Sequence, residues 1–197
     1  LEELAAVIEH VSITLNRRTF LIAESDLNDA RIVRVPEQYG YGLDAQWSDD
    51  FHHSVHTLLT GERSGYYRDF VAVPEEEDIP AGSLAPLKFV AKALREAYVY
   101  TGQYAPSRGR RHGNSAAGIP AYRFVVCIQN HDQVGNRVLG DRLTRLVSAE
   151  RLKLGAAVLL LSPYIPLLFM GEEYGEEQPF LYFVDHGDPA LIEAVRE

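Results

Sequence analysis

The chain has 197 residues, of which 46% are hydrophobic and 24% are charged. That balance is typical of an ordinary globular domain and not of a disordered chain. The formal net charge of −9 argues against nucleic acid or an anionic membrane as the main partner, because both require a basic surface.

Cysteine content and hydropathy indicate the kind of cellular compartment that suits the protein. Cys127 is the single cysteine, so no disulfide can form within the chain, and a reducing compartment suits it. No signal peptide opens the sequence, and no apolar run approaches the roughly 20 residues that a membrane span needs. We therefore expect a cytoplasmic protein without a membrane segment.

The first half of the chain predicts helix, strand, strand and helix. Apolar residues at helical spacing indicate a helix over residues 1–17. A strand is predicted at 19–23 (TFLIA), and a weaker one at 43–47 (LDAQW). A helix at 51–60 follows the second strand.

The second half continues this alternation. Ser83 can cap a helix that extends to Tyr98, and Ser148 can cap another that ends before Pro163. Strands are predicted at 124–128 (FVVCI) and 166–170 (PLLFM). Alternating helices and nearly continuous apolar strands are typical of an α/β fold with a parallel sheet.

Two segments interrupt the alternation. Residues 61–82 and 102–121 are rich in glycine and proline or acidic residues, and we predict that both are long loops. The chain also begins within one predicted helix and ends within another, which Asp188 can cap and Pro189 can start. We therefore expect both ends to lie inside a longer polypeptide.

Reactive side chains follow each predicted strand. The four groups are Glu24-Ser25-Asp26, Ser48 to His53, Gln129 to Gln133, and Gly171-Glu172-Glu173. One polar group after a strand is expected of any solvated loop. Four groups in register predict a carboxylate-lined site at the carboxyl ends of the strands, where (β/α)₈ barrels carry their catalytic residues.

Residue types limit the chemistry of such a site. The chain has no phosphate-binding glycine loop and no G-x-S-x-G nucleophile elbow. His52 and His56 are spaced to face one metal ion with Asp49 or Asp50 nearby, but they lack the glutamate of an H-E-x-x-H motif. We favour loop-capping or substrate-contacting roles for them, and expect neither metal nor cofactor.

The carboxylates that follow the predicted strands favour glycoside hydrolysis as the reaction. Cleavage of an acetal needs one carboxylic acid to protonate the leaving oxygen and a second carboxylate near the cationic carbon. Glu24 and Asp132 both follow predicted strands. We therefore predict that they converge over one cavity.

Five sequence blocks carry a family resemblance. IAESDLND (Ile22 to Asp29) resembles the third signature region of the α-amylase superfamily, and CIQNHDQVGNR (Cys127 to Arg137) is similar to the fourth. Together with YGLDAQWSDDFHH (41–53), GQYAPSRGRRHG (102–113) and LLLSPYIPLLFMGEEYGE (159–176), they resemble the maltooligosyltrehalose trehalohydrolase family within it. The resemblance covers nearly the whole chain.

The resemblance implies part of a (β/α)₈ TIM barrel, approximately strands 5 to 8 with their helices. Residues 1–197 would form a partial catalytic domain with a long excursion at about 61–121. The superfamily's nucleophilic aspartate follows strand 4 in a segment of D-G-x-R-x-D type, and nothing similar occurs here. The partner would be the missing N-terminal half of the barrel, and we expect these residues alone to be inactive.

The resemblance also implies an activity and its residues. The reaction is hydrolysis of the α-1,4 bond next to the terminal trehalosyl unit of maltooligosyltrehalose, with retention, releasing trehalose. Glu24 would be the proton donor and later the base, and Asp132 would stabilise the transition state. The implied substrate-binding residues are Asp49, Asp50, Phe51, His52, His53, His131, Gln133, Val134, Gly135 and Asn136.

Several interpretations remain open beside this one. An α-glucan branching or transglycosylating enzyme would use the same carboxylates, and a non-catalytic fragment would bind α-glucan without cleaving it. Trp47, Phe51 and Tyr104 are candidates to stack on sugar rings, although the first two suit a core equally well. The basic loop from Arg108 to His112 is either a solvated loop or a wall of the substrate groove.

Overall fold

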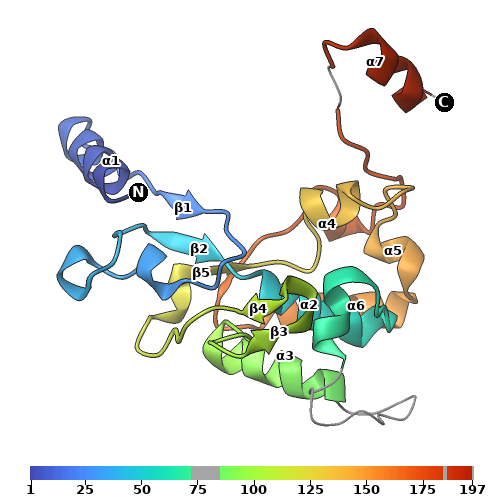
Figure 1. Cartoon of the computed structure of the whole chain (residues 1–197), viewed down its shortest axis with the longest axis horizontal. Helices are drawn as coiled ribbons and strands as arrows, with labels where there is room; N and C mark the ends of the chain where they lie inside the picture. Colours follow the sequence, from blue (N-terminus) through green and yellow to red (C-terminus); the bar gives the residue numbers. More distant parts are fainter. Residues whose placement is uncertain (72–84, 184–185, 197) are drawn as a thin grey trace.

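The computed structural model describes residues 1–71, 85–183 and 186–196 (Figure 1). The helices are α1 (Glu2–Thr14), α2 (Asp49–Thr60), α3 (Ala85–Glu96), α4 (His131–Gly135), α5 (Leu143–Leu146), α6 (Ala149–Leu160) and α7 (Pro189–Arg196). The strands are β1 (Ile22–Ala23), β2 (Ala45–Trp47), β3 (Tyr104–Ala105), β4 (Arg110–Arg111), β5 (Phe124–Val126) and β6 (Ile165–Pro166).

Four strands form one parallel sheet in the order β1-β2-β5-β6. Its register pairs Ile22 with Ala45, Gln46 with Phe124, and Val125 with Ile165. Because β3 and β4 pair only with each other, the main sheet strands follow one another in chain order, and α2 and α3 lie between β2 and β5. The predicted α/β class with a parallel sheet is confirmed.

The strands are shorter than the apolar runs that predict them. The last one is displaced most, because it pairs at Ile165 and Pro166 and not over the predicted 166–170. Its pairing ends after the Leu167 amide donates to the Val126 carbonyl at 2.8 Å. β6 is an outer strand of the described sheet, where a proline is tolerated because no ladder donor is lost on the open side.

Helix boundaries follow the predicted capping residues where these are described. The Ser148 hydroxyl accepts from the Arg151 amide at 3.4 Å, and the Asp188 carboxylate accepts from the Ala190 amide at 2.8 Å. Gly61 ends α2 with a positive φ of 74°, which glycine adopts without strain. Ser83, the third predicted cap, lies outside the described residues. No helix among those described is long and apolar enough to cross a membrane.

The core lies around α2, which is buried along most of its length. Leu59 of α2 meets Gly155 of α6, where an added Cβ would come within 2.8 Å of the leucine. On the other side, Tyr164 accepts from the Ala97 amide at 2.7 Å, just after α3 ends. The buried core residues include Phe51, Val55, Leu59, Val90, Ala93, Tyr98, Phe124, Val126, Ile128, Leu143, Leu159 and Tyr164.

The N-terminal helix contrasts with this core. α1 has no buried residue, and Leu1, Leu4 and Val7 are between 47% and 60% exposed. Figure 1 shows α1 beside β1 at one side of the molecule and α7 extended away from the body at the other. An apolar helix side without cover indicates that α1 is a poor source of stability by itself.

The two predicted loops contain some regular structure. Gly65–Phe70 form a 3-10 helix, and Tyr104–Ala105 pair antiparallel with Arg110–Arg111. The prediction that 102–121 is a long loop was therefore wrong at this hairpin. Pro106 starts its 3-10 turn, and Gly109 closes it with a φ of 61°, so these residues form the turn instead of preventing it.

Candidate active site

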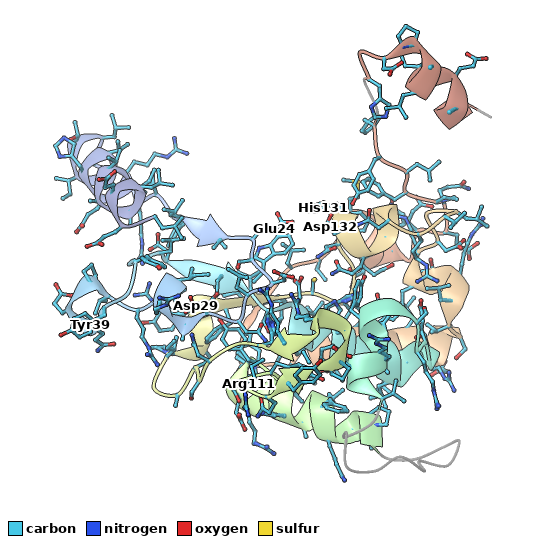
Figure 2. The ribbon with its side chains drawn as sticks, in the orientation of Figure 1. Glu24, Asp29, Tyr39, Arg111, His131 and Asp132 are labelled. Carbon is cyan, nitrogen blue, oxygen red and sulfur yellow. The ribbon has the colours of Figure 1, made fainter. Side chains whose placement is uncertain are left out.

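Glu24, His131 and Asp132 meet at the carboxyl edge of the sheet. Glu24 follows β1 directly, whereas His131 and Asp132 begin α4 beyond β5. Parallel strands present their carboxyl ends on the same edge, so residues more than 100 positions apart become neighbours. Figure 2 shows the three labelled side chains gathered there, away from Tyr39 and Arg111.

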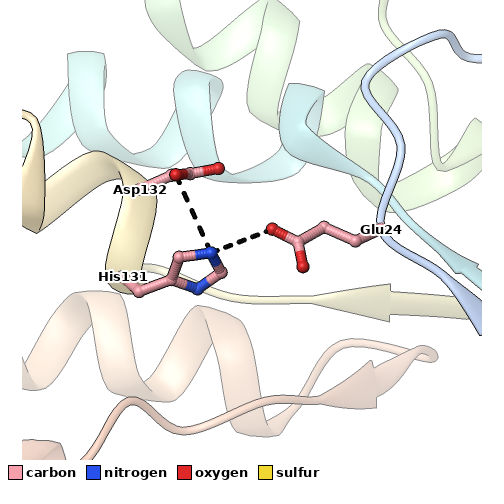
Figure 3. A group of neighbouring side chains, drawn as sticks. All are labelled: Glu24, His131 and Asp132. Atoms are coloured by element: carbon pink, nitrogen blue, oxygen red, sulfur yellow. Dashed lines mark ion pairs between the residues drawn. The ribbon is translucent and has the colours of Figure 1, made fainter. Parts of the chain in front are cut away.

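His131 lies between the two carboxylates. Its Nε2 atom is 3.1 Å from Glu24 Oε1 and 3.7 Å from Asp132 Oδ1 (Figure 3). The side chains of Glu24, His131 and Asp132 are 50%, 42% and 54% exposed, so a substrate can reach all three. The convergence predicted for Glu24 and Asp132 is therefore observed, while their catalytic roles stay predictions.

A cleft of about 660 Å³ opens at this cluster. Trp47 forms part of its wall and meets the His131 ring edge-on, with ring centroids 6.1 Å apart. This geometry is favoured for aromatic pairs and holds the imidazole against the wall. The cleft is lined by Glu24, Ser25, Asp26, Leu27, Trp47, Asn130, Asp132 and Asp49.

Asp49 is the most perturbed carboxyl group of the cleft. Burial raises its pKa to about 7, and the nearby carboxylates of Asp26, Asp50, Asp132 and Glu24 act in the same direction. Both causes disfavour the charged form. The cleft therefore contains a carboxyl group that can keep its proton near neutral pH and donate a hydrogen bond.

Tyr182 is a site residue that the sequence reasoning missed. Its hydroxyl donates to Asp132 Oδ1 at 2.9 Å, and burial followed by this contact raises its pKa to about 12. The ring packs on Gly135, where an added Cβ would stand 2.6 Å from the tyrosine. No local pattern in the sequence signals this contact, because Tyr182 and Asp132 are 50 positions apart.

Asp50, predicted to bind substrate, lies in a buried network instead of the cleft. It is 5% exposed, and its Oδ2 accepts from Asn28 Nδ2 and from the Val99 and Tyr100 amides at 2.7, 2.7 and 2.8 Å. Burial raises its pKa against the lowering effect of these hydrogen bonds. This Asp50 network ties α2 to the Glu24 loop and to the turn after α3.

Four other predicted substrate residues are also buried. Phe51 packs in the core and is fully buried, and His52, His53 and Val134 are between 1% and 5% exposed. Burial lowers the pKa of His53 to about 3, so this imidazole is neutral at ordinary pH. These side chains have almost no surface with which to contact substrate directly in this structure.

The remaining predicted residues divide between two places. Gly135 lies under Tyr182, whereas Gln133 and Asn136 line a second cavity between α4 and the segment after α2. Tyr104 is 55% exposed on the β3–β4 hairpin and is not among the residues that line the cleft. From the same hairpin, Arg108 reaches the cleft rim and donates to Asp26 Oδ2 at 2.8 Å.

One set of ligand atoms could share a metal ion among the described residues. It is Glu24, His131 and Asp132, whose candidate atoms all lie within 4.8 Å of one another. The His52 and His56 rings do stack, with centroids 5.4 Å apart, but His56 Nε2 contacts Glu62 Oε2 at 2.9 Å. The metal-binding pair considered from its spacing is therefore not aimed at an open site, because His56 is engaged with Glu62 and His52 is buried.

Comparison with known proteins finds relatives that share one name. The chain is 51% identical over 177 residues to malto-oligosyltrehalose trehalohydrolase from Saccharolobus solfataricus. It is 45% identical over 193 residues to the enzyme of that name from Mycobacterium tuberculosis, and 44% identical over 195 to that from Arthrobacter ramosus. These matches cover 90–98% of this chain but only 29–32% of the relatives.

A solved structure supports the same relationship. The crystal structure of an alpha-amylase-like protein from Salmonella typhimurium superimposes with a TM-score of 0.78 at 43% identity. The match covers 96% of this chain and 31% of that one. No family model matches the chain. The resemblance drawn from the five sequence blocks is confirmed, and the chain spans about a third of the length of its relatives.

Proposed function

We propose that this chain, which is homologous to malto-oligosyltrehalose trehalohydrolases along nearly its whole length, is part of the catalytic domain of such an enzyme. The complete protein would hydrolyse the α-1,4 bond next to the terminal trehalosyl unit of maltooligosyltrehalose and release trehalose. The observation that carries this proposal is the convergence of Glu24 and Asp132 on His131 in one open cleft.

The chemistry assigns a different task to each carboxyl group. Glu24 gives its proton to the glycosidic oxygen as the bond from that oxygen to the anomeric carbon breaks. Asp132, oriented by Tyr182, stabilises positive charge on the sugar with its carboxylate. His131 lies 3.1 Å from Glu24 and is placed to donate a hydrogen bond to a sugar hydroxyl.

Retention of configuration requires a nucleophile that these 197 residues do not supply. Following the superfamily pattern, we assign it to an aspartate in a segment outside this chain. It forms a bond to the anomeric carbon as the leaving group departs, and water then replaces it while Glu24 takes up the proton of that water. Residues 1–197 by themselves would therefore hydrolyse nothing appreciable.

The barrel placement belongs to the same proposal. The four parallel strands would be strands 5 to 8 of a (β/α)₈ barrel, with 61–121 as an excursion of one catalytic domain. Two observations support it. Within the described sheet, β1 and β6 each pair on one side only, and α1 exposes its apolar residues. The remaining barrel strands would pair with these edges and bury α1.

The exposed residues of the site are the ones that we expect to contact substrate. Asp49, His131, Gln133 and Asn136 have accessible surface near the cleft or beside α4. The buried Asp50, Phe51, His52, His53 and Val134 would act by holding these groups in place. A cytoplasmic location, in keeping with the buried Cys127 thiol, is part of the proposal.

Product analysis of the complete enzyme tests the proposed activity. The protein is incubated separately with maltooligosyltrehalose and with amylose. Trehalose from the first substrate and no new α-1,6 branches from the second are the expected results. Branches without trehalose would establish the transglycosylating alternative, and binding without turnover would establish the non-catalytic one.

Metal-assisted hydrolysis is the second candidate, because Glu24, His131 and Asp132 could share an ion. Exhaustive chelation followed by the trehalose assay separates it from acid–base catalysis. We expect the rate to stay unchanged. Loss of activity that only a divalent cation restores would favour the metal mechanism.

A further inference from the structure

The segment that carries Tyr182 has little regular structure. Residues 170–182, which we call the strap, follow β6 and contain a short 3-10 helix at Glu172–Tyr174. Near the end of the strap, the Tyr182 hydroxyl lies 2.9 Å from Asp132 Oδ1. A side chain on an irregular segment keeps a fixed position only if other contacts hold the backbone. The position of Tyr182 therefore depends on what anchors the strap.

Arg142 anchors the strap at two points. Its Nη1 atom donates to the Met170 carbonyl and its Nε atom to the Gln178 carbonyl, each at 2.7 Å. These carbonyls belong to the first residue of the strap and to a residue near its other end. Arg142 is the N-cap residue of α5 and is almost completely buried. Because the guanidinium is planar and always charged, it holds two acceptors at a fixed separation.

Aromatic rings connect Arg142 to Tyr182. The Arg142 guanidinium lies over the Phe169 ring, 4.9 Å from its centroid. Phe169 meets Phe180 edge-on with ring centroids 5.1 Å apart, and Phe180 meets Tyr182 edge-on at 6.0 Å. Edge-to-face contacts favour one ring orientation as well as one separation. Packing is therefore continuous from the guanidinium to the tyrosine that is bonded to Asp132.

The residues on both sides of Arg142 also contact the strap. The Thr144 hydroxyl donates to the Glu176 carbonyl at 2.6 Å, and the Phe180 amide donates to the Gly140 carbonyl at 3.0 Å. Gly140 has a φ of 61°, and an added Cβ would stand 2.3 Å from the Phe180 carbonyl oxygen. The backbone of the strap is therefore fitted closely to the segment in which Arg142 is central.

We propose that Arg142 is a positioning residue for the reaction, because it holds the strap so that Tyr182 fixes the orientation of the Asp132 carboxylate. The inference rests on the proposed function, and the family resemblance implies no role for Arg142. Arg142 does not line the cleft, so it acts through Tyr182 and not on the substrate. Loss of a contact that matters only in the transition state lowers kcat and kcat/KM together. Replacing Arg142 should therefore lower kcat and leave KM unchanged.

A double-mutant cycle in the complete enzyme tests this role. Trehalose release is measured for Arg142→Met, Tyr182→Phe and the variant with both substitutions. Methionine keeps an apolar chain against Phe169 but donates no hydrogen bond. We expect Arg142→Met to lower kcat about threefold to fivefold and to change KM less than about twofold. In the Tyr182→Phe enzyme, the same substitution should lower kcat less than about 1.5-fold, because the link to Asp132 is already broken.

Arg123→Met is the matched control. Arg123 Nη1 also donates to two main-chain carbonyls, those of Leu43 and Asp44, at 3.1 and 3.0 Å. These residues precede β5 and β2, so the contacts lie at the opposite edge of the sheet from the cleft. The control should keep its kcat even if its melting temperature falls as far as that of Arg142→Met. An unchanged kcat in folded Arg142→Met, an equal loss with and without the Tyr182 hydroxyl, or the same loss in the control overturns the positioning role.

The outcomes separate this role from the proposed activity. If the unsubstituted enzyme releases no trehalose, the proposed function fails, and crystal structures of the two methionine variants test Arg142 instead. Displacement of Tyr182 from Asp132 in Arg142→Met but not in Arg123→Met supports the inference, and an intact contact in both refutes it. Should Arg142→Met fail to fold, Arg142→Lys replaces it under the same criteria, since lysine keeps the charge but not the planar pair of donors.

Discussion

The cleft and the Asp50 network both contain carboxylates, but the two regions differ in how exposed these side chains are and in how many hydrogen bonds they accept. In the cleft, Glu24 and Asp132 are about half exposed, and each lies beside His131. In contrast, Asp50 is almost completely buried and accepts three hydrogen bonds on one oxygen. Exposure and the number of fixed donors therefore distinguish a carboxylate available for chemistry from one that holds the fold.

The contrast is sharpest between Asp49 and Asp50, which are neighbours in the first turn of α2. Successive helical residues point about 100° apart. One side chain consequently lines the cleft, while the other joins α2 to Asn28 and the turn after α3. The first is expected to influence pH dependence and the second to influence stability.

The largest effect is expected from the titration of Asp49. Its pKa is about 7 in the folded protein against an ordinary value of 3.8, so the folded state binds its proton more tightly than the unfolded state. Stability should therefore fall as pH rises from about 4 to about 7, by at most about 4 kcal/mol. Asp49→Asn should remove this loss, measured as denaturant unfolding of the complete protein at several pH values.

Asp26, whose charge also contributes to the raised pKa of Asp49, shows the opposite pH dependence. Burial alone would raise its pKa, but the hydrogen bond and charge of Arg108 outweigh burial and lower it. Asp26→Asn should therefore weaken the protein above pH 4 instead of strengthening it. If Asp49→Asn and the unsubstituted protein show parallel pH profiles, the assignment of a partly buried, protonated Asp49 is wrong.

The second-largest effect is expected from Asp50→Ala, a variant that should be less stable than the unsubstituted protein. Removing the carboxylate leaves Asn28 Nδ2 and the Val99 and Tyr100 amides without their buried acceptor. We expect the free energy of unfolding to fall by about 3 kcal/mol, which denaturant titration measures. Glu150→Ala, at an acid that is 83% exposed, should change it by less than about 0.5 kcal/mol. Equal stability of the two variants would refute the structural role of the network.

A smaller effect is expected from Tyr182→Phe. The substitution removes the 2.9 Å hydrogen bond to Asp132 but keeps the ring against Gly135. Trehalose release should slow by about threefold to tenfold, with an unchanged melting temperature, because one hydrogen bond to a charged group is lost. Tyr174→Phe, which removes a bond to the surface residue Glu176, should leave the rate unaltered. A Tyr182→Phe enzyme as fast as the control would show that Tyr182 does not position Asp132.

The same comparison shows what the sequence can predict. The meeting of Glu24 with His131 and Asp132 was predictable because each follows a strand of one parallel sheet, whose carboxyl ends share an edge. Apolar runs and capping residues also located α6 and α7. These features depend on local patterns or on a general rule of topology.

The remaining features depend on tertiary contacts. Asp49 and Asp50 are identical in type, and only the packing of the turn after α3 makes one of them buried. Tyr182 reaches Asp132 from 50 positions away, through a segment without periodicity. The end of β6 is set by where its pairing with β5 stops, and the apolar run continues beyond that point.

Substitution of Glu24 by glutamine in the complete enzyme tests the central claim most directly. The amide keeps the size of the side chain but has no acidic proton, so trehalose release from maltooligosyltrehalose should fall by about a thousandfold, while the melting temperature and maltopentaose binding persist. Glu173→Gln, at an exposed glutamate after β6, should remain active. A Glu24→Gln enzyme that releases trehalose at the unsubstituted rate would contradict the assignment of Glu24 as the acid.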